Sequence, residues 1–167
     1  MREQLHQPVL GAVPLDGDGS AWAAATTDSL VIFSGHSKPE HYAWDEVEQG
    51  SWDVDERAFT LRWTDADRAD LVLSVPAGTR DGSTYASTDV APFAKALRQR
   101  VEAAIVHSAV TTLPSGATAT ASVRRGVDGH LYSVTRPTMS QVSDEQDAAA
   151  LQELENRVRE GVGLPTR

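Results

Sequence analysis

The sequence contains no cysteine. This absence excludes disulfides, thiol catalysis, iron–sulfur clusters and cysteine-ligated zinc. Small secreted domains usually depend on disulfides, so we expect a cytoplasmic protein. The first 13 residues hold no apolar run of signal-peptide length, and the longest apolar runs of the chain are far too short to cross a bilayer. The sequence therefore predicts a soluble protein that is not exported.

Positive charge is also scarce. The 167 residues include 24 acidic and 15 basic side chains, and the formal net charge is −9. A protein that holds nucleic acid electrostatically needs clustered lysine and arginine, whereas the one adjacent basic pair here is Arg124-Arg125. We expect no nucleic-acid partner, and no binding to phosphoinositides or to an anionic membrane.

Motifs that carry chemistry are missing as well. The chain has no Gly-x-Gly-x-x-Gly, no Gly-x-Ser-x-Gly, and no pair of histidines spaced for a metal on one helix turn. The segment 16–20, Asp-Gly-Asp-Gly-Ser, imitates the start of a calcium loop, but its twelfth position is Thr27 where an EF-hand needs glutamate. We interpret it as a structural turn. The sequence predicts no enzyme and no catalytic, cofactor-binding or metal-binding residue.

What the chain does contain is a series of short strands. Apolar or β-compatible segments are separated by turn signals over 9–14, 20–27, 30–33 and 40–43. Three further segments, near 51–55, 59–64 and 71–75, place apolar side chains at every second position, as in a strand buried on one side. Hairpin-length connections predict antiparallel pairing. Residues 76–88 are expected to be a loop.

Two helices are predicted. The first begins near Thr88 or Asp89 and runs to about His107 or Ser108, with an apolar stripe at three- and four-residue spacings. The second begins with a capping box of Ser143 and Gln146 and ends near Glu160. Its apolar stripe consists of Ala148, Leu151, Leu154 and Val158.

Between the helices, Asp128-Gly129 predicts a β-hairpin with a type I′ turn, because that turn needs positive φ at both central residues. Residues 110–113 are a candidate for one further strand. The chain therefore divides into two expected parts. Residues 8–109 form the strands with their helix, and residues 110–163 form the hairpin with the C-terminal helix, packed on the first part or on a second copy.

About seven antiparallel strands followed by one amphipathic helix is the order of a PH-like barrel capped by a helix, within a mainly β, α+β class. The segment 42–53, with Trp44, Trp52 and a small acidic patch between them, resembles a family of bacterial, actinobacterial-type PH-like proteins. In that resemblance a Leu-Val-Ile run precedes the segment, here residues 30–32, and an Arg-Val pair lies in the following helix, here residues 100–101. It spans roughly residues 8 to 110. The resemblance implies a fold and no site residues.

The sequence hypothesis for function is a non-enzymatic protein–protein interaction module. Binding would use an exposed sheet edge or the groove between sheet and helix, and the partner would be an unidentified protein or a second copy. The candidate surface residues are Trp44, Leu151, Leu154 and Val158. Packing beneath the bend is the alternative for Trp44. Two other functions stay open, namely a small-ligand binder or enzyme that uses a pocket at the barrel mouth, and a structural subunit of a homo-oligomer.

Overall fold

The computed structural model describes residues 5–167. The chain forms two compact units, of which the first ends at Glu102 and the second begins at Ala103. In the part of the chain that is described, none of the helices has the length and apolar character needed to cross a membrane.

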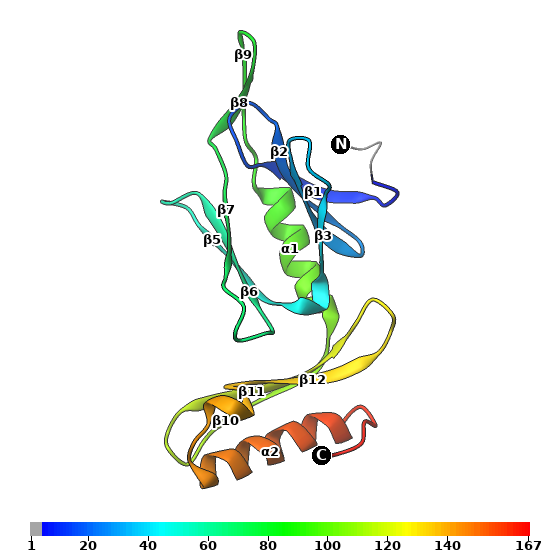
Figure 1. Cartoon of the computed structure of the whole chain (residues 1–167), viewed down its shortest axis with the longest axis vertical. Coiled ribbons are helices and arrows are strands. Elements are labelled where there is room, and N and C mark those ends of the chain that lie inside the picture. Colours follow the sequence, from blue (N-terminus) through cyan, green and yellow to red (C-terminus); the bar gives the residue numbers. More distant parts are fainter. Residues whose placement is uncertain (1–4) are drawn as a thin grey trace. The chain divides into compact units, whose positions relative to one another are not determined.

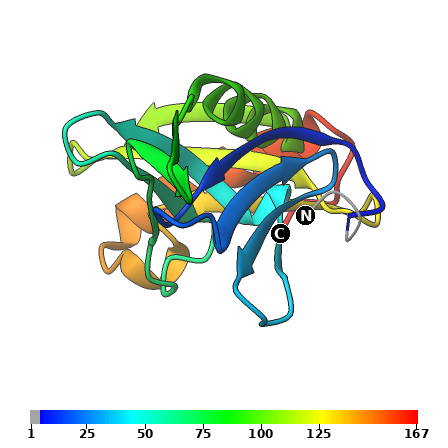
Figure 2. The same cartoon turned by 90° about the horizontal axis from the view of Figure 1, so that it is seen from above.

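The first unit begins with a four-stranded antiparallel meander. Its strands are β1 (Val9–Pro14), β2 (Ala21–Thr26), β3 (Ser29–Ser34) and β4 (Glu40–Ala43). They follow one another in space as they do in sequence, which leaves β1 and β4 at the edges (Figure 1 and Figure 2). These strands agree with the sequence prediction to within two residues at each end.

A short 3-10 turn, η2 (Trp44–Glu46), leads into a second antiparallel sheet. Its strands are β5 (Val47–Asp53), β6 (Ala58–Trp63) and β7 (Leu71–Ser74). Phe59 and Leu61 are fully buried while Arg62 is exposed, which is the alternation expected of a strand with one face in the core. The mainly β prediction with antiparallel sheets is confirmed. Strand pairing in residues 5–102 gives separate sheets, however, rather than one hydrogen-bonded barrel.

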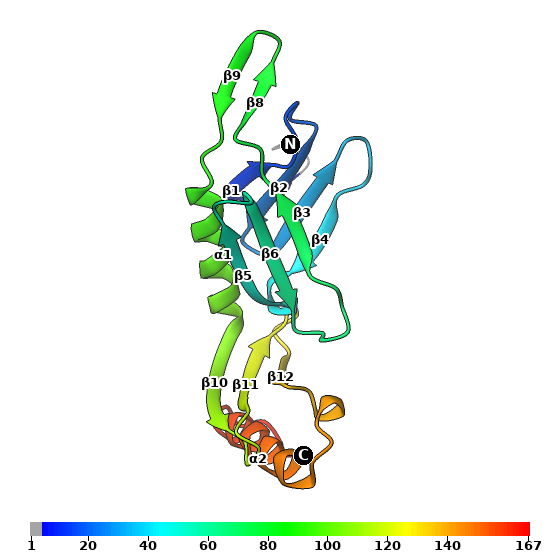
Figure 3. The ribbon, with the colours of Figure 1, turned by 90° about the vertical axis from the view of Figure 1, so that its left-hand side faces the viewer.

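The expected loop at 76–88 is a two-stranded hairpin instead. Its strands are β8 (Gly78–Asp81) and β9 (Thr84–Ser87), joined through Gly82 with φ +59° (Figure 3). All four residues of β9 are exposed. The hairpin therefore has no apolar alternation, which is the signal from which a strand is recognised in a sequence.

Helix α1 (Ala91–Ala104) closes the first unit. Its buried residues have the three- and four-residue spacings that the sequence predicts; they are Phe93, Ala96, Leu97, Val101 and Ala104. The ring of Phe93 meets that of Phe59 edge-on, with 4.9 Å between centroids. The predicted end at His107 is wrong, because strand β10 begins at Ile105. Ile105 and Val106 are β-branched, and such side chains favour a strand over a helix.

The four-stranded sheet buries side chains on both faces. Ala24, Val31 and Phe33 form a small cluster, with Leu5 and Trp22 packed against it, while their neighbours Ala23, Leu30 and Ala25 are also fully buried. This double burial explains the continuous apolar run of β3, since a strand covered on both sides needs no polar alternation.

The second unit is a three-stranded antiparallel sheet with a helix on one face. It contains β10 (Ile105–Thr112), β11 (Thr118–Arg125), β12 (Leu131–Arg136), η3 (Met139–Gln141) and α2 (Glu145–Glu160). The sequence predicts a hairpin here, with residues 110–113 as a candidate further strand, and in the structure that strand is β10, which begins five residues earlier at Ile105. The core of this unit consists of Leu113, Ala119, Ala121, Val123, Leu151, Leu154 and Val158.

Two local predictions in the second unit are wrong. The N-cap of α2 is Asp144, whose carboxylate accepts from the backbone N–H of Gln146 and of Asp147, both at 2.9 Å, so Ser143 lies outside the helix. In the β11–β12 turn only Gly129 of the Asp-Gly pair has a positive φ, at +81°. The Asp128 carboxylate instead accepts from the N–H of His130, and the turn is longer than type I′.

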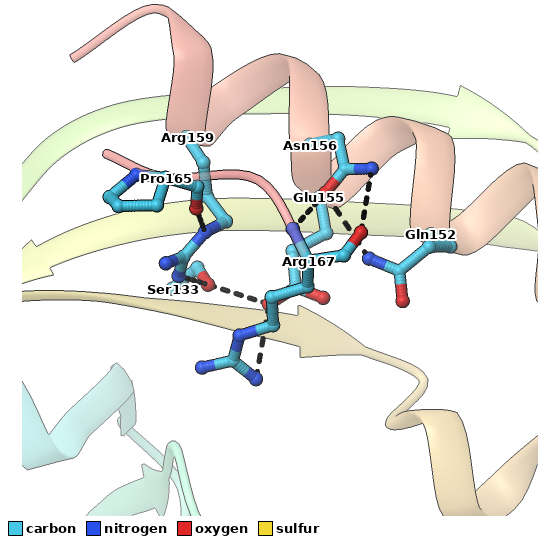
Figure 4. Close-up of polar contacts among 7 residues, drawn as sticks. All are labelled: Ser133, Gln152, Glu155, Asn156, Arg159, Pro165 and Arg167. Carbon is cyan, nitrogen blue, oxygen red and sulfur yellow. Dashed lines mark hydrogen bonds and ion pairs between the residues drawn. The ribbon is translucent and has the colours of Figure 1, made fainter. Parts of the chain in front are cut away.

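A polar network fastens β12 and the C-terminal segment to α2 (Figure 4). The Ser133 hydroxyl donates to Glu155 Oε1 at 2.6 Å and accepts from Arg159 Nη1 at 2.7 Å. Arg159 Nε donates to the carbonyl of Pro165 at 2.6 Å, and the N–H of Arg167 donates to Asn156 Oδ1 at 3.0 Å. Glu155 and Arg159 are both buried, and these bonds satisfy their charges.

Candidate functional site

A hollow of about 500 Å³ lies between strand β1 and the first turns of α1. Leu10 forms its wall on the strand side. The other lining residues are Asp89, Ala91, Pro92, Lys95, Ala96 and Gln99. All of them belong to the first unit, and we refer to this hollow as the β1–α1 groove.

Two glycines let α1 approach the strands closely enough to form this groove. A Cβ placed on Gly11 of β1 would come within 2.6 Å of backbone atoms of Pro92 and Phe93. A Cβ placed on Gly50 of β5 would come within 2.7 Å of the Leu97 side chain. Helix α1 therefore packs directly on β1 and on β5, each of which is an edge strand of its own sheet.

The strand wall of the groove is an edge with unpaired backbone. Strand β1 pairs with β2 on one side, and among residues 5–167 no other strand pairs with it. The register shifts between Val9 and Gly11, so Leu10 sits in an irregularity and stays 42% exposed. An apolar side chain thus stands at a strand edge with which no other strand of residues 5–167 pairs.

The helix wall contributes polar groups. Asp89 Oδ1 accepts from the N–H of Ala91 at 3.0 Å and so satisfies one donor at the start of α1. Lys95 and Gln99 lie one turn apart on the exposed side of the helix, and both line the groove. The groove combines an apolar patch from Leu10 and Pro92 with the carboxylate of Asp89, the ammonium of Lys95 and the amide of Gln99.

The four surface residues of the sequence hypothesis lie elsewhere, in the cores of their own units. Trp44 is 4% exposed, and its indole Nε1 donates to the carbonyl of Thr26 at 3.0 Å. Leu151, Leu154 and Val158 are each at most 1% exposed and pack on β11 and on Leu113. The apolar stripe of α2, which the sequence hypothesis offers to the first part of the chain or to a second copy, is covered by the sheet of its own unit. None of the four side chains is presented to a partner by its own unit.

The calcium-like segment 16–20 is occupied with its own hydrogen bonds. Asp16 Oδ1 accepts from the N–H of Ser20 at 2.8 Å, and Asp16 Oδ2 accepts from the Ser20 hydroxyl. Burial is the largest single influence and raises the pKa of Asp16, but these bonds and one from the N–H of Ala21 together hold that pKa below its usual value. In residues 5–167, no group of three or more acidic or histidine side chains is placed to hold a metal ion.

Sequence reasoning did not single out the residues of the β1–α1 groove. The available signal was Gly11, since a glycine inside a predicted strand marks a bulge or a close backbone approach. Leu10 was hidden because an apolar residue in a strand is ordinarily assigned to the core. Nothing local in the sequence shows that α1 returns to lie beside β1.

No protein-family model matches this sequence. No curated protein matches it either. Among solved structures, the chain is similar to the crystal structure of the FERM and C-terminal domain complex of Drosophila Merlin, with 15% sequence identity and a TM-score of 0.38. The match covers 58% of this chain and 29% of that chain. At this level of likeness, we describe the fold from the chain's own strand pairing and burial. Residues 5–167 form a mainly β structure with antiparallel sheets and two α-helices.

Proposed function

We propose that this protein is a cytoplasmic, non-enzymatic interaction module on a PH-like scaffold, and that it binds an extended peptide segment of a partner protein in the β1–α1 groove. The scaffold assignment is supported by the order of the first unit, in which a four-stranded meander, a three-stranded meander and the β8–β9 hairpin are followed by one helix. Fold alone does not give a function, so the proposal depends on the site.

The observation that carries the proposal is the unpaired edge of β1 beside the hollow. An extended peptide can add to such an edge, because the strand's free N–H and C=O groups supply backbone hydrogen bonds. Alternate side chains of the added strand then point to one face, where they enter neighbouring pockets. Here Leu10 and Pro92 would receive an apolar side chain.

The ammonium of Lys95 adds a preference for charge. Lys95 is one of two lysines in a chain of net charge −9, and it lies in the groove wall. A carboxylate in the bound segment would be attracted to it at short range. The proposed ligand is therefore an extended segment with one apolar anchor and one nearby acidic residue.

The test begins with peptides selected on the intact protein from a random peptide display library. We expect selected peptides to share an apolar anchor with a neighbouring acid, and to shift the backbone amide resonances of residues 9–14 in a two-dimensional NMR titration. Leu10→Asp should weaken binding at least about tenfold, because it places a carboxylate in the apolar part of the groove.

The matched control is Val54→Asp, which makes a similar change at a side chain that is 69% exposed in the β5–β6 turn. It should leave the affinity unchanged. Selected peptides that shift other resonances and bind equally well to Leu10→Asp would contradict the proposal, as would a selection that yields no binding peptide.

A further inference from the structure

We infer that strand β10 is a self-pairing edge, through which two copies of this chain form an antiparallel dimer with one sheet continuous across both second units. This inference concerns a different surface and a different partner from the β1–α1 groove, and it does not depend on the proposed peptide site.

One side of β10 is available for pairing. The sheet order of the second unit is β10-β11-β12, so β10 has β11 on one side only. No backbone hydrogen bond from Ile105–Thr112 to anything except β11 is found in residues 5–167. The unpaired N–H and C=O groups along this edge form a template for another strand.

This edge has few of the features that usually prevent strand addition. Its eight residues, Ile-Val-His-Ser-Ala-Val-Thr-Thr, include no proline, no glycine and no formally charged residue. The register shift near Ile105 lies at its beginning, and from His107 to Thr112 the pairing with β11 is regular. Two other edge strands, β4 and β7, are shorter, with four residues each.

The exposed side chains of β10 favour a second copy as the partner. Ala109 packs against the core under α2, so Ser108 and Val110 lie on the opposite face of the sheet. Val106 and Val110 are 37% and 65% exposed, and each lies two residues from Ser108. A two-fold axis through Ser108 would bring Val110 of each copy to the beginning of the other copy's β10, where Val106 lies in the register shift, and one symmetric contact would cover these exposed valines.

Charge also favours this contact over others between two copies. Each chain carries a formal charge of −9, so two copies repel through most of their surfaces. Helix α2, for example, presents Glu153 and Glu160 on its exposed side. Strand β10 brings no acidic group to the contact. An edge contact of this size is small, so we expect a weak dimer that depends on concentration.

The first experiment is sedimentation of the full chain over a range of concentrations, with Val110→Lys as the test variant. We expect a reversible monomer–dimer equilibrium, and at least about tenfold weaker association for Val110→Lys, because a charge on the edge opposes strand addition. Val72→Lys is the control, since Val72 is 57% exposed on the edge strand β7. It should leave association unchanged.

The second experiment uses the absence of cysteine. Residues directly opposite each other on antiparallel strands have Cα atoms about 4.5 to 5.5 Å apart, a separation that a disulfide can bridge. Under mild oxidation, Ser108→Cys should form a covalent dimer much faster than Ser74→Cys, a control at an exposed position of β7. This comparison decides the matter even if Val110→Lys fails to fold.

Three results would overturn the inference. The first is a wild-type chain that sediments as a monomer at every concentration reached. The second is a Ser108→Cys variant that crosslinks no faster than Ser74→Cys. The third is a dimer that survives Val110→Lys in folded form, which would place the contact elsewhere.

Discussion

At the scale of single residues, Tyr42 shows how a surface side chain acquires an unusual titration. Its hydroxyl donates to the carboxylate of Glu40, and its ring packs on Trp63 with 5.1 Å between centroids. The hydrogen bond to Glu40, then burial, then the charge of Glu40 raise the pKa of Tyr42, while the nearby guanidinium of Arg68 opposes the rise. The protonated phenol is therefore the form that the folded state prefers.

The consequence is a stability contribution that is lost in alkali. Because the folded pKa is raised above the ordinary value of 10.0, the contribution is fully present below pH 10 and disappears as the pH rises through the folded pKa. We expect Glu40→Gln to lower the pKa of Tyr42 toward its ordinary value, as followed by ultraviolet absorbance, with Tyr42→Phe identifying the signal. Arg68→Gln should shift it in the opposite direction. An unchanged titration in Glu40→Gln would contradict this account.

At the scale of elements, helix α1 packs closely on β1 at Gly11 and on β5 at Gly50, and the cost of a larger side chain differs between the two sites. An added methyl group at Gly11 meets the backbone of Pro92 and Phe93, which can yield only if the helix moves. At Gly50 it meets the end of the Leu97 side chain, which can adopt another rotamer. We expect Gly11→Ala to lower the free energy of unfolding by about 1–3 kcal/mol, as overpacked sites do, and Gly50→Ala to cost less.

Urea denaturation followed by circular dichroism measures both variants. Gly17→Ala is the control, because a Cβ at Gly17 meets nothing within 4 Å and its φ lies outside the left-handed region. Equal losses for Gly11→Ala and Gly50→Ala would show that the helix, and not a side chain, moves at both sites.

The elements also show what could be predicted from the sequence. Strands with a buried face, such as β6, and the stripes of α1 and α2 were predictable because burial imposes a period on the residues. The end of α1 was not, since Ile105 continues the apolar spacing of the helix while its backbone pairs with Arg124. The β8–β9 hairpin was missed because its exposed residues carry no such period.

The candidate site follows the same logic. The apolar stripe of α2 was read from its spacing, but its cover, Ala119, Ala121 and Val123, is an alternating row of small side chains that could face any helix. Apolar periodicity indicates that a residue is buried, but it does not identify the element that packs against it. The β1–α1 groove joins residues about 80 positions apart in the chain, and only the tertiary fold brings them together.

At the scale of the whole molecule, each unit has its own core. Leu154, 1% exposed, lies in the core of the second unit, so Leu154→Ala should destabilise it by about 2–5 kcal/mol. We expect amide hydrogen exchange to accelerate in β11, β12 and α2 while β2, β3 and β6 keep their protection. Equal acceleration in both units would show that they unfold as one.

The division into two units has an optical consequence. All four tryptophans, Trp22, Trp44, Trp52 and Trp63, belong to the first unit, and Tyr132 is the one aromatic residue between Ala103 and Arg167. Indole emission therefore reports on the first unit alone, because the second unit contains no tryptophan. Any change in ellipticity without a matching change in that emission belongs to the second unit, so its behaviour can be followed in the unlabelled protein by subtraction.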